Sequence, residues 1–236
     1  MKSIVKTLIL TFLSYQCIAA TRTWNGTTGN WSDSTRWGGT VPQNGDDAVI
    51  NSGSVLLSSD TAVLGSLTMG GGTLTCSNWN TRIRATNVVI NGGTLTLPSA
   101  FSTNSPSSNR VWIVATNFTL GASAQINADY AGYLRLNGPG AGSSIYSTSY
   151  GSGAGYGGEG RYDTGGSPGG KPYGNINAPI YPGSGGGHPT YGGAGGGAAH
   201  RHVGRCHVDR STTRAGRCSR RRCAAGASRT RRGRGP

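Results

Sequence analysis

Apolar and polar residues alternate with a period of two in four segments of the chain, and a short link divides each segment into two halves. Such alternation predicts strands with one buried face. Three of the links are rich in Gly or Asn, which tolerate the positive φ of a tight corner, so each segment is expected to form strand, corner and strand, followed by a looser return. The paired halves are residues 48–50 and 55–57, 67–69 and 74–76, 88–90 and 95–97, and 118–120 and 126–128.

The four segments recur at intervals of 19, 21 and 30 residues, measured between positions 50, 69, 90 and 120. A repeat of this kind predicts a solenoid, in which each coil buries its apolar face against the next one. Equivalent strands would place like side chains over one another. The expected columns are Leu67, Val88 and Phe118; Met69, Ile90 and Leu120; and Leu74, Leu95 and Ile126. No helical periodicity is sustained after residue 20, so an all-β fold is predicted.

Residues 1–20 have the organisation of a signal peptide. Lys2 and Lys6 give a cationic start, an apolar stretch follows, and Ala19-Ala20 provides a small-residue end. We expect cleavage after Ala20 and a secreted or cell-surface protein. The apolar stretch is shorter than the ~20 residues that a membrane span needs, so no span is expected after signal removal.

Residues 21–47 are rich in tryptophan and precede the first coil. Trp24, Trp31 and Trp37 lie in the pattern W-x-G, N-W-S and W-x-G, which is followed by Pro42 and by G-D-x-A-x-I at 45–50. This spacing resembles the opening module of bacterial exported β-helix proteins of the autotransporter-adhesin and surface-repeat type. The resemblance implies a right-handed parallel β-helix, a tryptophan cap and a role at or beyond the cell surface. It carries no catalytic residue.

The three tryptophans allow two interpretations. As a cap, they would cover the open end of the solenoid, where core and strand edges are otherwise exposed. As a binding set, Trp24, Trp31 and Trp37 would stack on sugar rings. We favour the cap, because the terminal units of repeat proteins must differ from the internal ones to stay soluble.

Catalytic chemistry finds little support in the sequence. Polysaccharide lyases and glycoside hydrolases need clustered or paired carboxylates, but acids are sparse, and the neighbours Asp46 and Asp47 would point to opposite faces of a strand. We therefore expect no enzyme, no cofactor and no metal site. Arg82 and Arg84 share a strand face and, with Arg110, form a candidate patch for an acidic glycan or simply a solvated coil edge.

The coils are expected over residues 48–136, and a Gly/Tyr insertion follows at 137–199. A flexible linker is the compositional default for glycine-rich sequence. This insertion is not a simple repeat, however, and it resembles the glycine-rich insertion of large bacterial surface β-helix proteins. We favour an ordered loop that projects from the solenoid.

Residues 200–236 differ in character from the rest of the chain. They hold most of the excess basic charge of a chain whose formal net charge is +14, together with three of its five cysteines. A genuine tail of this composition would bind nucleic acid or an anionic surface. Its Cys and His spacings match no standard zinc finger. We favour a disordered tail that results from a shifted reading frame, so no nucleic-acid partner is expected unless the tail is genuine.

Together these features predict a non-enzymatic structural or adhesion protein built on a β-solenoid, with extracellular glycans or surfaces as its partners. The alternative is a carbohydrate-binding or polysaccharide-cleaving β-helix protein whose active coils are missing from this chain.

Overall fold

The computed structural model describes residues 19–102, 110–144, 150–175 and 180–208. Most of the predicted signal peptide and the tail beyond residue 208 lie outside the described residues. Within the described ranges the chain is almost entirely β, as predicted, and its only helix is the 3-10 helix η1 (Ser34–Trp37). None of the described residues forms a helix with the length and apolar character required to cross a membrane.

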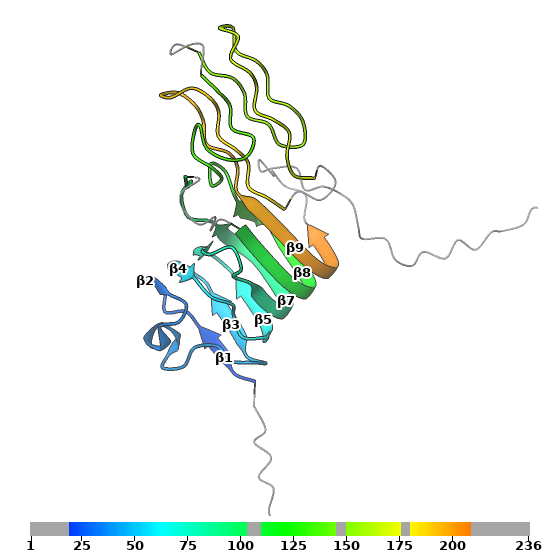
Figure 1. Cartoon of the computed structure of the whole chain (residues 1–236). Helices are drawn as coiled ribbons and strands as arrows, with labels where there is room; N and C mark the ends of the chain where they lie inside the picture. The colour runs from blue at the N-terminus through cyan, green and yellow to red at the C-terminus, as the bar shows by residue number, and fades with distance from the viewer. Residues whose placement is uncertain (1–18, 103–109, 145–149, 176–179, 209–236) are drawn as a thin grey trace, which may run out of the picture.

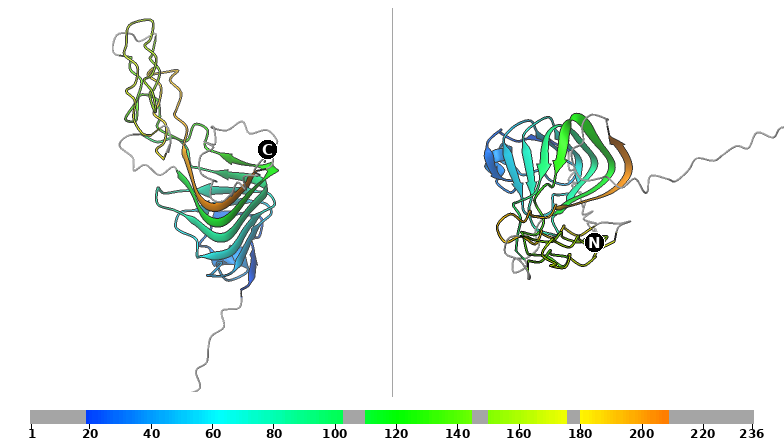
Figure 2. Two further views of the ribbon diagram at one scale, coloured as in Figure 1. Left: turned by 90° about the vertical axis from the view of Figure 1, so that its right-hand side faces the viewer. Right: turned by 90° about the horizontal axis from the view of Figure 1, so that it is seen from above.

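Nine strands pair in parallel to form a single curled sheet (Figures 1 and 2). One path through the sheet runs β1-β3-β5-β7 and continues to β8 and β9, and a second path runs β2-β4-β6 and also reaches β7. The strands are β1 (Thr21–Thr23), β2 (Thr28–Asn30), β3 (Asp47–Ile50), β4 (Ser54–Leu57), β5 (Leu64–Met69), β6 (Thr73–Cys76), β7 (Ile83–Thr96), β8 (Arg110–Asn127) and β9 (Ala198–Val208).

The predicted side-chain columns are confirmed by the strand register. Leu67 pairs with Val88 and Val88 with Phe118, while Met69 pairs with Ile90 and Ile90 with Leu120. The third column is formed by Leu74, Leu95 and Ile126. All but Ile126 are buried, and Ile126 packs against the core as a half-buried residue. Stacked coils thus exclude water from apolar faces that a single coil would expose.

β7 and β8 also include a third strand segment, which lies before the two strand halves that the sequence predicted and which we call the third strand face. β7 and β8 are long because they begin in the segment that was expected to be a loose return. There Ile83 pairs with Ile113, and Ala85 pairs with both Leu64 and Ala115. These five side chains are buried, so the return contributes to the core.

Glycine occupies the same corner in successive coils. Gly53, Gly72 and Gly93 have φ values of 82°, 74° and 79°. A Cβ on Gly72 would lie 2.8 Å from the carbonyl oxygen of Gly53 in the preceding coil. The corner therefore requires glycine for its backbone conformation and for the close approach of the coils.

The described parts of the Gly/Tyr insertion are extended segments that run side by side away from the sheet (Figure 1). Backbone hydrogen bonds join them: Gly185 N donates to the Asn137 carbonyl at 2.9 Å, and Gly160 N donates to the Gly170 carbonyl at 2.9 Å. At Gly140 a Cβ would lie 2.6 Å from the Lys171 carbonyl oxygen. The described parts are thus packed backbone against backbone, an arrangement that glycine permits.

β9 crosses the expected boundary between the insertion and the tail. Residues 200–208, in contrast to the disorder expected for them, pair in parallel with β8, from Trp112 opposite His200 to Leu120 opposite Val208. Arg201 lies at the position of the buried Ile113, and Cys206 at that of Phe118. Polar side chains thus occupy inward positions in this last strand, and Cys206 is exposed.

Candidate functional site

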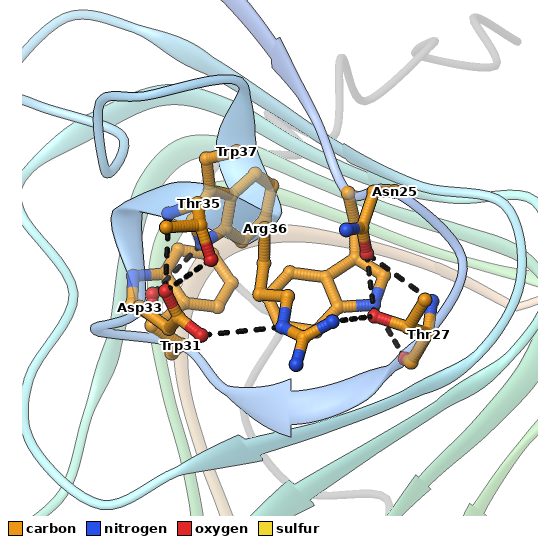
Figure 3. Close-up of polar contacts among 8 residues, drawn as sticks. Asn25, Thr27, Trp31, Asp33, Thr35, Arg36 and Trp37 are labelled. Atoms are coloured by element: carbon orange, nitrogen blue, oxygen red, sulfur yellow. Dashed lines mark hydrogen bonds and ion pairs between the residues drawn. The ribbon is translucent and has the colours of Figure 1, made fainter.

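The three tryptophans of the N-terminal region pack together at the beginning of the sheet (Figure 3). Trp24, Trp31 and Trp37 are 3%, 5% and 2% exposed. The ring centroid of Trp37 lies 5.1 Å from that of Trp24 and 4.7 Å from that of Trp31, in edge-to-face arrangements that aromatic rings favour. Because their surfaces are buried, the rings offer no platform for a sugar in this conformation, and the geometry favours the cap.

Hydrogen bonds fix the orientation of the cap. The indole nitrogen of Trp24 donates to the Thr27 carbonyl, and that of Trp37 donates to the Trp31 carbonyl, both at 2.8 Å. Both indole N–H groups belong to buried side chains and would be costly to leave without a hydrogen-bond partner.

Asp33 supports the short helix that carries Trp37. Its carboxylate accepts hydrogen bonds from the Thr35 hydroxyl at 2.6 Å and the Thr35 amide at 3.0 Å, and from Arg36 Nε at 3.2 Å. The Thr35 hydroxyl is the main cause that holds the pKa of Asp33 below its ordinary value. Arg36 continues the network to the Thr27 hydroxyl at 2.8 Å (Figure 3).

A second group, which we call the Arg-Trp cluster, consists of Trp79, Arg82, Arg110, Trp112 and His200. The Arg110 guanidinium lies between two indoles, 4.4 Å from the Trp79 centroid and 4.0 Å from the Trp112 centroid. Arg82 lies 5.3 Å from the Trp112 centroid, and the Trp112 and His200 rings are 6.3 Å apart. Cation-π contacts join the segment before β7 to β8, and the contact between the Trp112 and His200 rings joins β8 to β9.

The cationic groups of the cluster are engaged internally. Arg82 forms an ion pair with Asp60, with 2.6 Å between Nη2 and Oδ2. Arg110 is 8% exposed and its Nε donates to the Trp79 carbonyl at 2.9 Å. Burial lowers the pKa of Arg110, and burial together with the charge of Arg110 lowers that of His200.

The predicted basic patch is therefore divided by the structure. Arg82 and Arg110 come together around Trp112, while Arg84 lies outside the cluster at the next outward position of β7, half-buried and close enough to Asp60 to lower its pKa. The sequence did not indicate the roles of Trp79, Trp112 and His200. Equivalent positions in consecutive coils could have suggested the contact between Trp112 and Arg82.

Five carboxylates have structural partners. Asp33 and Asp60 bind arginines, Asp46 binds backbone amides and Arg22, Asp47 accepts from the Ser66 hydroxyl, and Asp163 accepts from the Ser167 amide. Among the described residues, no three His, Cys, Asp or Glu side chains are grouped so as to hold a metal ion. Cys76 is buried, and burial raises the pKa of its thiol to about 12, so little of the reactive thiolate is present near neutral pH.

A shallow hollow lies on the outer surface of three strands, β2, β4 and β6. Small residues line it together with the exposed Leu56, and the surface that they present to the hollow is mostly apolar. Its lining residues are Thr28, Gly29, Asn30, Ser54, Val55, Leu56 and Thr75. The hollow is wide and open to solvent.

Comparison with known proteins finds one family. Residues 35–129 match the G8 domain, and this range begins within η1 and ends just after β8. No curated protein and no solved structure matches the chain. Trp24 and Trp31 of the cap, the Gly/Tyr insertion and β9 lie outside the matched range, whereas Trp37 lies within it. The segment from η1 through β3 to β8 is the part of the chain that is similar to a G8 domain.

Proposed function

We propose that the chain is a non-enzymatic structural or adhesion protein that acts outside the cell, and that its coils form a right-handed parallel β-helix. The observation that carries this proposal is the parallel register of successive strands from β3 to β8, with buried apolar columns inside and threonine and valine side chains outside. Right-handed connections are strongly preferred between parallel strands of one sheet, which supports the handedness.

The position of the carboxylates supports a scaffold more than an enzyme. Asp46 is 3% exposed and bound on both oxygens, and Asp60 is bound by both Nε and Nη2 of Arg82. Carboxylates that are held in this way stabilise the coils and are poorly placed to act on a substrate. The similarity to the G8 domain, which is found in extracellular proteins, supports export.

The proposed partner is an extracellular glycan or surface, bound through many weak contacts along the outer faces of the coils. Arg84 is the member of the predicted basic patch that could contribute, because Arg82 and Arg110 are held by Asp60 and the two indoles. An acidic polysaccharide would be favoured over a neutral one, and its binding would weaken with salt.

The test measures retention of the exported full chain on immobilised acidic and neutral polysaccharides at low and high salt. We expect retention on the acidic matrix, weakened by Arg84→Gln and unchanged by Arg161→Gln, which makes the same charge change on an exposed residue of the insertion. Hydrolysis of a polysaccharide by the chain would contradict the non-enzymatic proposal. Equal retention of both variants and the wild type would contradict the role of Arg84.

A further inference from the structure

The carboxylate of Asp46 is buried near the start of the described chain. Its Oδ1 accepts a hydrogen bond from the backbone nitrogen of Ala20 at 2.8 Å, and its Oδ2 accepts one from the Gln43 amide at 2.9 Å. Arg22 Nε lies 3.4 Å from Oδ2. Asp46 thus joins the entry of β1 to the loop before β3, with 3% of its surface exposed.

Ala20 is part of this arrangement, whereas Ala19 is not. The carbonyl of Ala20 accepts a hydrogen bond from the Asp47 amide at 2.9 Å, directly before Thr21 pairs with Asp47 in the sheet. Ala20 is half-buried and Ala19 is exposed. A chain that began at Thr21 would lose one donor to the Asp46 carboxylate and the acceptor of the Asp47 amide, and buried polar groups without partners are costly.

We propose that export processing cuts the bond between Ala19 and Ala20, and that the new amino terminus of Ala20 forms an ion pair with the Asp46 carboxylate. This inference depends on the proposed export of the chain. It moves the cut one residue before the position expected from the sequence, and Cys17 and Ala19 then occupy the small-residue positions of an A-x-A-like site.

The chemistry is hydrolysis by the signal peptidase of the exporting cell. Water supplies a hydroxyl to the Ala19 carbonyl carbon, the C–N bond breaks, and the leader departs with an Ala19 carboxylate. The released Ala20 amine takes up a proton, because an α-amino group is largely protonated at neutral pH. An amide N–H donor beside Asp46 is thereby replaced by an ammonium donor, which makes a stronger, charge-assisted hydrogen bond.

Processing would therefore stabilise the fold after export. The precursor has only the Arg22 charge near Asp46, whereas the mature chain has the charges of Arg22 and the Ala20 terminus. The carboxylate is shielded from solvent, so the added attraction is less screened than at an exposed site. The mature chain is expected to be more stable than the same chain with its amine blocked.

The first experiment determines the amino terminus of the full chain after expression and export by a bacterial host, using intact mass and terminal sequencing. The expected first residue is Ala20. An exported chain that begins at Thr21 would overturn this inference and leave the proposed export intact. A chain retained in the cell with its leader would overturn the proposed export and the processing step together.

The second experiment tests the ion pair without relying on export. Residues 20–236 are released from a removable amino-terminal fusion, and their thermal unfolding is compared with and without acetylation of the Ala20 amine. We expect acetylation to lower the Tm by about 3 °C or more, since ~1 kcal/mol shifts the Tm of a chain of this size by ~2–4 °C. Equal Tm values for the two forms would overturn the ion pair.

Matched variants locate the effect. Asp46→Asn should abolish the difference between free and acetylated chains, whereas Asp47→Asn should preserve it, because the Asp47 carboxylate is bonded to the Ser66 hydroxyl. If Asp46→Asn does not fold, the titration of the Ala20 amine in the wild-type chain decides the matter. A raised amine pKa supports the ion pair, and an unshifted one overturns it.

Discussion

The coils and the Gly/Tyr insertion both consist of chain segments that lie side by side, but different groups hold them together. In the coils, apolar side chains such as Met69 and Ile90 stack in buried columns. In the insertion, backbone hydrogen bonds join extended segments, as between Gly142 and Gly185 at 3.0 Å. The coils thus depend on the side chains inside them, and the insertion depends on the absence of side chains where its segments meet.

This difference has an energetic consequence. Burial of apolar surface is the main source of stability for the coils. Each ordered glycine of the insertion loses more backbone entropy than another residue would, and it buries no side chain in return. We therefore expect the insertion to be less stable locally than the coils that carry it, and to unfold separately from them.

The largest effect is expected from a cavity in a core column. Ile90→Ala would remove a fully buried side chain between Met69 and Leu120 and should lower the free energy of unfolding by about 3 kcal/mol. Val89→Ala, one position away on the outward face of β7, should cost clearly less. Urea denaturation followed by circular dichroism measures both. Equal losses for the two variants would contradict the inward and outward assignment.

A smaller effect is expected at the glycine corners. Gly72→Ala would impose both a positive φ and a clash with the Gly53 carbonyl, for a cost of about 2–3 kcal/mol. Gly45→Ala is the control, because Gly45 has a φ of 85° and a Cβ there would meet nothing within 4 Å, so it should cost only ~1 kcal/mol. The same denaturation experiment compares them. A cost for Gly72→Ala no greater than the control would show that close approach between coils is unimportant.

In the insertion the expected effect is local. A Cβ on Gly185 would overlap the Leu134 carbonyl, whereas one on Gly193 would meet nothing within 4 Å. Gly185→Ala should accelerate amide hydrogen exchange across the insertion by about tenfold or more while the coil amides stay protected. Gly193→Ala should leave exchange nearly unchanged. Loss of protection in the coils as well would mean that the two regions unfold as one unit.

The sequence predicted the coils well because the residues that stack in them are apolar side chains at regular spacings. The spacing of Leu67, Val88 and Phe118 was sufficient to predict which residues stack. The third strand face escaped prediction because its register depends on Ile83 and Ala85, which are separated from the next apolar pair by the exposed Thr86 and the half-buried Asn87 at a bend. This corner interrupts the alternation on which the strand prediction relied.

The candidate site was less predictable because its contacts join distant parts of the chain. The sequence grouped Arg82 and Arg84 on one strand face with Arg110 nearby, but the engagement of Arg82 with Asp60 and of Arg110 with Trp79 depends on how coils of unequal length stack. An ordered insertion was favoured because its sequence is not a simple repeat and because it resembles a known glycine-rich insertion, whereas composition by itself favoured a flexible linker. Its particular pairings, such as Gly132 N with the Gly195 carbonyl, leave no periodic signal because glycine has no side chain.

The smallest expected effect is a change in the stability of β9 with pH, caused by protonation of His200. The pKa of His200 is lowered by burial, by Arg110 and by His202, so the neutral form is favoured where the ring meets Trp112. A histidine whose pKa is lower in the folded state than its unfolded value near 6.5 contributes stability that is present above that value and lost as the pH falls below it. Amides of β9 should therefore exchange faster at pH 5 than at pH 7.5, after correction for intrinsic rates.

Substitution separates this effect from general acid destabilisation. His200→Gln should remove most of the pH dependence of exchange in β9, because no proton is then taken up beside Arg110. His207→Gln, at the other end of β9 opposite Thr119, should retain it. The coils from β3 to β7 are expected to keep their protection throughout, since their contacts are formed chiefly by apolar columns. Acceleration that persists in His200→Gln would show that another group controls the docking of β9 on β8.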